Sequence, residues 1–195
     1  MPKIKLWTRQ NRAILEILER DGVYYAKKDV IQQKFGACTD VVLKAYNWYV
    51  QKAKTLVPMP EGSQYPIWLS TCEEFGMRLT EDNVILEVEV DSEKALIFDM
   101  DKWSYIVNFW YLPRDDNDKE NHEMELKRYG ISNEASIFLN NYHPFLRSKV
   151  EKSWEGLFDD AFKLSDLTVA TLWEIRSEWI TKIIESEDDM DASSK

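Results

Sequence analysis

A regular alternation of apolar residues in the segment 84–91 constrains the fold more than any other feature of the chain. Every second position in this segment is valine or leucine, namely Val84, Leu86, Val88 and Val90. A period of two predicts a β-strand with one face buried and the other mostly in water. The fold must therefore contain a sheet that covers apolar residues on at least one side.

Other segments have the spacing of amphipathic helices. Residues 41–56 place apolar side chains at Val41, Ala45, Trp48, Tyr49 and Leu56. We expect Asp40 to cap this helix and Pro58 to end it. A first helix is predicted to end at Gly22, where a left-handed C-cap belongs, and another is predicted to begin at Pro144. Helices and strands together indicate the α+β class.

The remaining elements are shorter. Strands are predicted at residues 6–8, 65–70 and 95–98, and Asp99 or Asp101 is expected to cap a helix that ends by Pro113. The charged segment 114–125 lacks apolar periodicity, so it is predicted to be a solvated loop. The β-branched segments 168–175 and 180–184 favour two strands over one long helix. The sequence thus predicts a single domain with a small mixed or antiparallel sheet and amphipathic helices packed on it.

Length and composition set the domain limits and the compartment. The chain has 195 residues, enough for one domain over residues 1–184, and an acidic segment 185–195 that is expected to be disordered. Cys38 and Cys72 are too few for a disulfide framework, no segment is long and apolar enough to span a membrane, and the first residues do not look like a signal peptide. We therefore predict a cytoplasmic protein with no membrane association.

The charge of the chain argues against one class of partner. Lys and Arg number 25 against 35 Asp and Glu, a net charge of -10. A phosphate backbone would be repelled by such a molecule as a whole, so sequence-specific nucleic-acid binding is disfavoured. A basic protein partner remains open.

Motifs of known catalytic sites are missing. His122 and His143 have no Cys or His at ligand spacing, so we expect no metal site. The six glycines are scattered, which excludes a glycine-rich phosphate loop, and there is no nucleophile elbow. Cys38 is interpreted as a structural thiol, and Glu87 with Glu89 as carboxylates on a solvated strand face. The sequence leaves catalysis undecided and favours a protein that is not an enzyme.

Eight tryptophans raise the alternative of a stacking site for nucleotides. Most of them lie on apolar stripes and are expected in the core. Trp68 and Trp103 differ, because each lies at the end of an element beside the polar residues Ser70, Asp99 or Asp101. These two indoles are therefore the candidates for ligand contact.

Short elements spread over the chain resemble a bacterial family catalogued only as a domain of unknown function. Its members begin with an L-W-T-x-Q-like strand and share A-Y-x-W, S-W-x-x-(I/L)-F and A-T-x-W-E-(I/L) elements. The matching segments here are Leu6–Gln10, Ala45–Trp48, Ser153–Phe158 and Ala170–Ile175.

More distantly, the layout is similar to that of the ADP-ribosyltransferase superfamily, in which the first strand carries an Arg or His. Arg9 lies beside that position here. The resemblance places Ala170 or Thr171 where a transferase keeps its catalytic glutamate, and Glu174 falls out of register. It implies either a non-catalytic descendant that still binds a nucleotide or a partner, or an enzyme that uses another acid such as Asp99.

Two hypotheses about function follow. In the first, a groove binds NAD or another nucleotide through Arg9 for a phosphate, Trp68 or Trp103 for stacking, and Thr8, Gln10 and Asp99 for polar contacts. In the second, the protein is an acidic interaction module, inhibitor-like or antitoxin-like, that covers a basic partner surface. The acidic residues Asp115, Asp116 and Asp118 support the second hypothesis.

Overall fold

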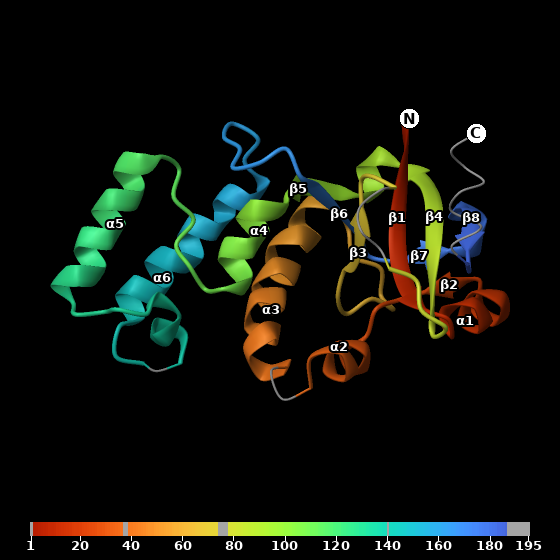
Figure 1. Cartoon of the computed structure of the whole chain (residues 1–195), viewed down its shortest axis with the longest axis horizontal. Coiled ribbons are helices and arrows are strands. Elements are labelled where there is room, and N and C mark those ends of the chain that lie inside the picture. The colour runs from red at the N-terminus through yellow and green to blue at the C-terminus, as the bar shows by residue number, and fades with distance from the viewer. Residues whose placement is uncertain (1, 37–38, 74–77, 140, 187–195) are drawn as a thin grey trace. The chain divides into compact units, whose positions relative to one another are not determined.

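The computed structural model describes residues 2–36, 39–73, 78–139 and 141–186 (Figure 1). Of these residues, those within 1–97 and 169–195 form one compact unit, unit 1, and those within 98–168 form a second, unit 2. Cys38 and residues 187–195 of the predicted tail lie outside the described residues. The prediction of one domain over residues 1–184 with a disordered tail stays a prediction.

The larger of the two β-sheets has six strands in the order β5-β6-β3-β1-β4-β8 (Figure 1). Its strands are β1 (Lys3–Asn11), β3 (Ile67–Ser70), β4 (Asn83–Asp91), β5 (Leu96–Asp99), β6 (Thr168–Leu172) and β8 (Ile180–Ile184). Each recorded register is antiparallel, and β1 pairs with β4 over nine positions, from Lys3↔Asp91 to Asn11↔Asn83. A two-stranded sheet joins β2 (Val23–Tyr24) to β7 (Ile175–Arg176). The predicted α+β class and the strands near the C-terminus are confirmed.

The strand β4 differs from its prediction in one respect. Its second face is not wet, because Ile85 is 1% exposed and Glu87 is 8% exposed. The strand lies inside the sheet, between β1 and β8, and the middle of its second face is buried while Glu89 and Asp91 on that face are half-buried. The carboxylate of Glu87 is accommodated there by Lys5 Nζ at 2.9 Å and Thr181 Oγ1 at 2.6 Å.

Unit 1 also contains the helices α1 (Ile14–Asp21), α2 (Lys28–Phe35) and α3 (Thr39–Leu56). Gly22 ends α1 with a φ of 71°, as predicted. The predicted cap of α3 is wrong, because the helix begins at Thr39 and Asp40 lies in its first turn. The predicted apolar face of α3 is partly wrong as well. Val41 and Leu56 are exposed, whereas the buried residues include Leu43, Tyr46 and Val50.

Unit 2 contains α4 (Met100–Val107), α5 (Asp116–Arg128) and α6 (Pro144–Ser153), with short 3-10 helices at η3 (Glu134–Phe138) and η4 (Trp154–Phe158). Pro144 starts α6, as predicted, and of the two predicted caps of α4, Asp99 and Asp101, the structure has Asp99. Helix α4 ends at Val107, well before Pro113, so Trp110 lies outside it. The Trp154 ring stacks on Phe138 at a centroid distance of 5.3 Å, and this pair forms part of the core of unit 2.

The predicted loop at residues 114–125 is wrong, because α5 occupies most of it. The side chain of Asp115 accepts a hydrogen bond from Asp118 N at 2.8 Å and caps the helix. Acidic residues begin α5 and basic residues end it, an order that favours the helix macrodipole. Only His122 is buried among its residues, so α5 shows no apolar stripe in the sequence.

No helix in the described ranges is both long and apolar enough to cross a membrane.

Candidate functional site

A cavity of about 390 Å³ lies in unit 1, between the C-terminal half of β1 and the start of β3. It is lined by Arg9, Gln10, Asn11, Tyr24, Ala26, Ile31, Tyr46, Pro66, Ile67, Trp68, Asp82 and Asn83. We call this cavity the β1–β3 groove. Three of its lining residues, Arg9, Gln10 and Trp68, are among the site residues expected from the sequence.

The backbone pairing explains why a groove forms here. Strand β1 pairs with β3 at Trp7↔Ser70, whereas it pairs with β4 along its whole length. Closer to Gln10, a side chain of β1 connects this strand to β3, because Thr8 Oγ1 donates a hydrogen bond to the Trp68 carbonyl at 2.8 Å. Gln10 Nε2 in turn donates to Thr8 Oγ1 at 2.8 Å. Thr8 is thus buried and structural, and it positions Gln10 and Trp68 at the groove.

One wall of the groove is aromatic. The Trp68 ring lies 5.8 Å from the ring of Tyr46 and 5.6 Å from that of Tyr49, measured between centroids. Burial raises the pKa of Tyr46 to about 12, and burial together with the charge of Asp29 raises the pKa of Tyr24. Both phenols are therefore neutral at neutral pH. The packing holds the Trp68 indole in a fixed orientation beside the groove.

Arg9 contributes the positive charge of the groove. Its side chain is exposed, and Nη1 donates to the carbonyl of Arg78 at 3.0 Å. This contact uses one of the five N–H donors of a guanidinium, so the others are available to a ligand. Asp82 is the acidic residue among the lining residues.

Two predicted site residues belong to unit 2. Trp103 is half-buried on α4. Asp99 Oδ1 caps α4 by accepting from Asp101 N at 2.8 Å, and Asp99 Oδ2 accepts from the backbone N–H groups of Leu164 and Ser165. Both carboxylate oxygens of Asp99 are thus used to hold the chain together, which accounts for its burial.

Thr171, one of the two positions expected to replace a catalytic glutamate, is buried in β6. Its Oγ1 lies 2.5 Å from Tyr49 Oη, a neutral hydrogen bond between α3 and the sheet. Burial raises the pKa of Tyr49, so the phenol keeps its proton. This position carries a packing contact and no negative charge.

The sequence reasoning missed several groove residues. Tyr24 and Asn83 carried no motif that could identify them. Tyr46 lies inside the Ala45–Trp48 element, and that element was the available signal for it.

Within the described residues, no three His, Cys, Asp or Glu side chains lie close enough together to hold a metal ion. His122 is buried, and its Nε2 lies 2.8 Å from Glu134 Oε1. The ring of His122 stacks on Tyr111 at 4.1 Å between centroids. The contacts of His122 therefore tie α5 to the rest of unit 2.

Comparison with models of protein families gives a match that covers most of the chain. A family model described as "Domain of unknown function (DUF3841)" matches residues 5–181. No curated protein and no solved structure gives a significant match. The resemblance to a family known only as a domain of unknown function is confirmed, and the similarity to ADP-ribosyltransferases stays a prediction.

Proposed function

We propose that this chain, which belongs to the family described as a domain of unknown function (DUF3841), is a ligand-binding protein. The β1–β3 groove is the proposed site, and its ligand is nucleotide-like. The observation that carries the proposal is the presence of Arg9, Gln10 and Trp68 in one cavity. They supply a cation, an amide and an aromatic face, the three groups that a phosphate, a ribose and a base require.

The size and lining of the groove support a small molecule. Its volume of about 390 Å³ lies in the range of ligand sites, roughly 300–1,000 Å³. Such sites are mostly apolar with a few polar groups that fix orientation. Ile67, Pro66, Ala26 and Ile31 provide the apolar part here.

Arg9 is the proposed contact for phosphate. A guanidinium binds two phosphate oxygens at once, and Arg9 is exposed enough to turn toward them. Its existing bond to the Arg78 carbonyl keeps the head group near the groove. The net charge of the chain is negative, so attraction of an anionic ligand must come from this local charge.

The base is proposed to stack on Trp68, which Tyr46 and Tyr49 hold in place. Gln10 is held by Thr8 through its amide nitrogen, and this bond leaves the amide oxygen of Gln10 to accept a hydrogen bond from the ligand. A ring held rigidly before binding costs little entropy when it stacks.

We further propose binding without catalysis. Ala170 and Thr171 are buried and uncharged, and Thr171 is bound to Tyr49. The alternative acid, Asp99, already accepts hydrogen bonds on both oxygens. Neither position offers a free carboxylate that could stabilise a developing positive charge. NAD or ADP-ribose is therefore expected to be bound and not cleaved.

The test is isothermal titration calorimetry with ADP-ribose, NAD, AMP and adenosine. The three phosphate-containing ligands should bind more tightly than adenosine. Replacement of Arg9 by alanine should remove that difference, and Trp68→Leu should weaken all four ligands. A ligand at one hundred times its dissociation constant should also add about 2.7 kcal/mol to stability.

Arg20→Ala is the matched control, because Arg20 is exposed on α1, pairs with Asp21 and does not line the groove. It should bind all four ligands like the wild type. No binding at millimolar concentration, or equal binding by Arg9→Ala and Arg20→Ala, would contradict the proposal.

A second candidate function is an acidic interaction module, and helix α5 favours it. Asp116, Glu120 and Glu123 are exposed and follow one another at spacings of four and three, so they share one face of the helix. A basic partner surface would be attracted to this face, and salt would weaken the complex.

This candidate is tested by affinity capture at low and high salt. The double variant Asp116→Lys/Glu120→Lys should lose a partner that the wild type retains at low salt. Glu19→Lys, an exposed charge reversal on α1, should retain it. Equal capture by both variants would argue against the acidic face as the binding surface.

A further inference from the structure

We infer that a cavity in unit 2 binds a methylated ammonium cation, the group that choline carries. The cavity measures about 360 Å³, within the range of small-molecule sites, roughly 300–1,000 Å³. Its lining includes Tyr105, Trp110, Tyr111, Lys119, Glu123 and Glu134. We call it the Trp110 cavity. It lies in a different unit from the β1–β3 groove, so the inference does not depend on the nucleotide proposal.

Two aromatic rings form a corner of the Trp110 cavity. The ring centroids of Tyr105 and Trp110 lie 6.0 Å apart, and the two ring planes meet at 81°. A group placed in such a corner contacts both rings at once. A cation within about 6 Å of a ring centroid is attracted to the negative π face, and tryptophan attracts it most strongly. Corners built from aromatic rings are the sites that bind quaternary ammonium groups.

Trp110 is exposed although its backbone is held firmly. Its side chain is 44% exposed. Its backbone N–H donates to the Tyr105 carbonyl at 2.9 Å, and its own carbonyl accepts from Trp154 Nε1 at 2.7 Å. The preceding residue, Phe109, turns the chain with a φ of 59°. The fold therefore holds this indole at the surface, and a ligand that covers it removes apolar area from water.

Tyr111 connects the Trp110 cavity to α5. Its ring stacks on that of His122 at 4.1 Å between centroids, and its Oη donates to Asp118 Oδ1 at 2.9 Å. Burial, followed by the hydrogen bond to Asp118, raises the pKa of Tyr111 to about 12, so the phenol keeps this bond at neutral pH. Lys149 Nζ lies 5.3 Å from the centroid of the same ring. Tyr111 is therefore part of the frame, and the cation contact is assigned to Tyr105 and Trp110.

The charges in the lining favour a cation. Glu123 on α5 is exposed. Glu134 on η3 is held in place, because its Oε1 accepts from Tyr111 N and lies against His122 Nε2, both at 2.8 Å. Lys119 is the opposing charge, but it is exposed and its long side chain can extend into water. Two carboxylates against one ammonium make the lining acidic, and the chain as a whole carries a charge of -10.

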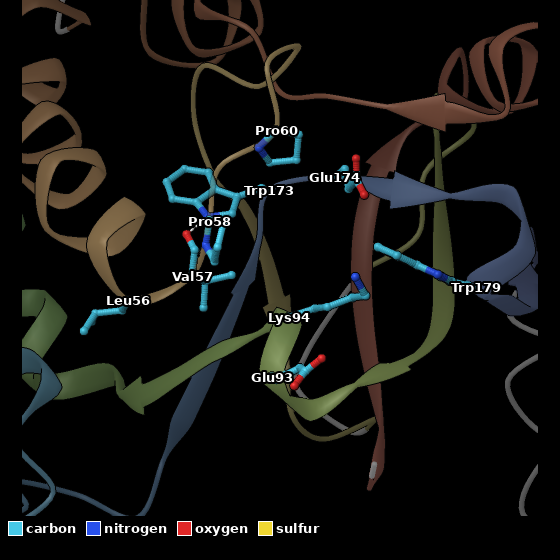
Figure 2. Close-up of a pocket in the computed structure, with 9 residues that line it drawn as sticks. All are labelled: Leu56, Val57, Pro58, Pro60, Glu93, Lys94, Trp173, Glu174 and Trp179. Carbon is cyan, nitrogen blue, oxygen red and sulfur yellow. Dashed lines mark hydrogen bonds between the residues drawn. The ribbon is translucent and has the colours of Figure 1, made fainter.

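A cavity in unit 1 has aromatic walls as well, but cations of the chain itself already face them. Figure 2 shows this cavity, of about 480 Å³, with Lys94, Trp173, Glu174 and Trp179 in its lining. Glu174 pairs with Arg176, and Lys94 Nζ lies 5.7 Å from the centroid of the Trp179 ring. An added cation would be repelled there, so the inference is confined to the Trp110 cavity.

The experiment compares choline with dimethylbutanol, its uncharged isostere, in which a carbon replaces the nitrogen. Isothermal titration calorimetry on the full chain should show about tenfold tighter binding of choline, the effect of a partly desolvated cation–π contact. Ethanolamine, which has a bare ammonium, should bind more weakly than choline, because that group is strongly hydrated. In NMR, choline should shift the indole N–H signal of Trp110, assigned by its loss in Trp110→Phe.

Variants separate the π contact from the charge of the lining. Trp110→Leu should lose the preference for choline over dimethylbutanol, whereas Trp110→Phe should keep part of it. Glu123→Gln should weaken choline and leave dimethylbutanol unchanged, and Lys119→Gln should strengthen choline. Glu120→Gln is the matched control, because Glu120 is exposed on the same helix and does not line the cavity. It should bind choline like the wild type.

Trimethylammonium groups also occur in lipid head groups. A phosphatidylcholine head group would bring its phosphate toward Glu123 and Glu134, which repel it. The wild-type chain should therefore stay in the supernatant when phosphatidylcholine vesicles are sedimented. Sedimentation that Trp110→Leu abolishes would overturn the assignment of a free cation.

Three other results would overturn the inference: equal binding of choline and dimethylbutanol to the wild type, no shift of the Trp110 signal in millimolar choline, or the same preference in Trp110→Leu and Glu120→Gln. The probe pair on the wild-type chain decides the matter even when a variant does not fold. Arg9→Ala should bind choline like the wild type, so a failure of the nucleotide proposal would leave this result unaffected.

Discussion

Asp99 binds Ser165 through both of its carboxylate oxygens. Ser165 N donates to Oδ2 at 2.8 Å, and Ser165 Oγ donates to Oδ1 at 3.1 Å. Leu164 N donates to Oδ2 as well, at 2.6 Å. This carboxylate therefore anchors the segment before β6 to the start of α4, within unit 2.

Replacing Asp99 should destabilise the protein without any ligand present. Asp99→Ala removes the acceptor for four backbone N–H groups, those of Asp101, Lys102, Leu164 and Ser165. Each buried donor left without a partner costs about 1–3 kcal/mol. We expect the free energy of unfolding, measured by urea denaturation, to fall by at least about 2 kcal/mol, which is the cost of a single buried donor left without a partner. Asp101→Ala, an exposed change in the same turn, is the control and should have a much smaller effect. A near-neutral Asp99→Ala would show that these hydrogen bonds contribute little.

Asp99 should also make the free energy of unfolding depend on pH in the acidic range. Burial by itself raises the pKa of Asp99, but hydrogen bonds from Ser165, Leu164 and Asp101 outweigh it and lower the pKa below its usual value. The folded chain then binds fewer protons than the unfolded chain. This contribution is complete above the unfolded-state pKa of about 3.9 and is lost as the pH falls through the folded-state pKa. The stability difference between wild type and Asp99→Asn should therefore shrink below pH 4, measured by urea denaturation across that range.

Lys102 should respond to alkaline pH. It is 2% exposed, and its Nζ donates to the carbonyls of Gly156 at 3.1 Å and Asp159 at 2.7 Å. Burial lowers the pKa of Lys102, although the nearby Asp99 and Asp159 oppose the shift. The unfolded chain therefore binds more protons between the folded-state pKa and the unfolded value of about 10.4. In that window the free energy of unfolding should rise with pH more steeply for the wild type than for Lys102→Met. Parallel curves for the two proteins would contradict this prediction.

Phe109 should reverse the usual order of alanine and glycine substitutions. It has a φ of 59° and is 4% exposed, with its ring stacked on Phe138 at 4.8 Å between centroids. Loss of the ring should cost about 3–5 kcal/mol in either variant. The left-handed backbone costs alanine roughly 1–2 kcal/mol but suits glycine. We therefore expect Phe109→Gly to be more stable than Phe109→Ala by about 1 kcal/mol in thermal or urea unfolding. The opposite order would mean that the backbone relaxes in the variants.

The cap of α5 should be measurable as helix stability. Asp115→Ala removes the side-chain bond to Asp118 N and should cost about 1 kcal/mol, with a loss of helical circular dichroism. Asp116→Ala is the matched control, because Asp116 lies in the first turn and makes no capping bond. If the two variants lose equal stability, the acidic charge and not the cap stabilises this helix.

Part of the fold was determined by the sequence alone, because the signals involved are local. The alternation at Val84–Val90 predicted β4, and Gly22 predicted the end of α1. Pro144 likewise predicted the start of α6. Each of these depends on backbone dihedrals or on a short period, which need no information about distant residues.

Other elements depended on contacts that no local pattern contains. Helix α5 buries only His122, so periodicity could not reveal it. The buried side of β4 at Glu87 exists because Lys5 and Thr181, distant in sequence, neutralise and bond its carboxylate. Burial of a charge can be judged only when its partners are known.

The residues of the candidate site also fall into those that the sequence indicated and those that only the structure revealed. From the sequence, Arg9 was selected through the resemblance to ADP-ribosyltransferases and Trp68 through its polar neighbours, and both line one groove together with Gln10. Only the tertiary structure showed that Asp99, besides capping α4, binds Leu164 and Ser165, and only it brought Tyr46 to the groove. The reason is physical: a sequence specifies which groups are present, but the pairing of strands and the packing of helices decide which of them meet.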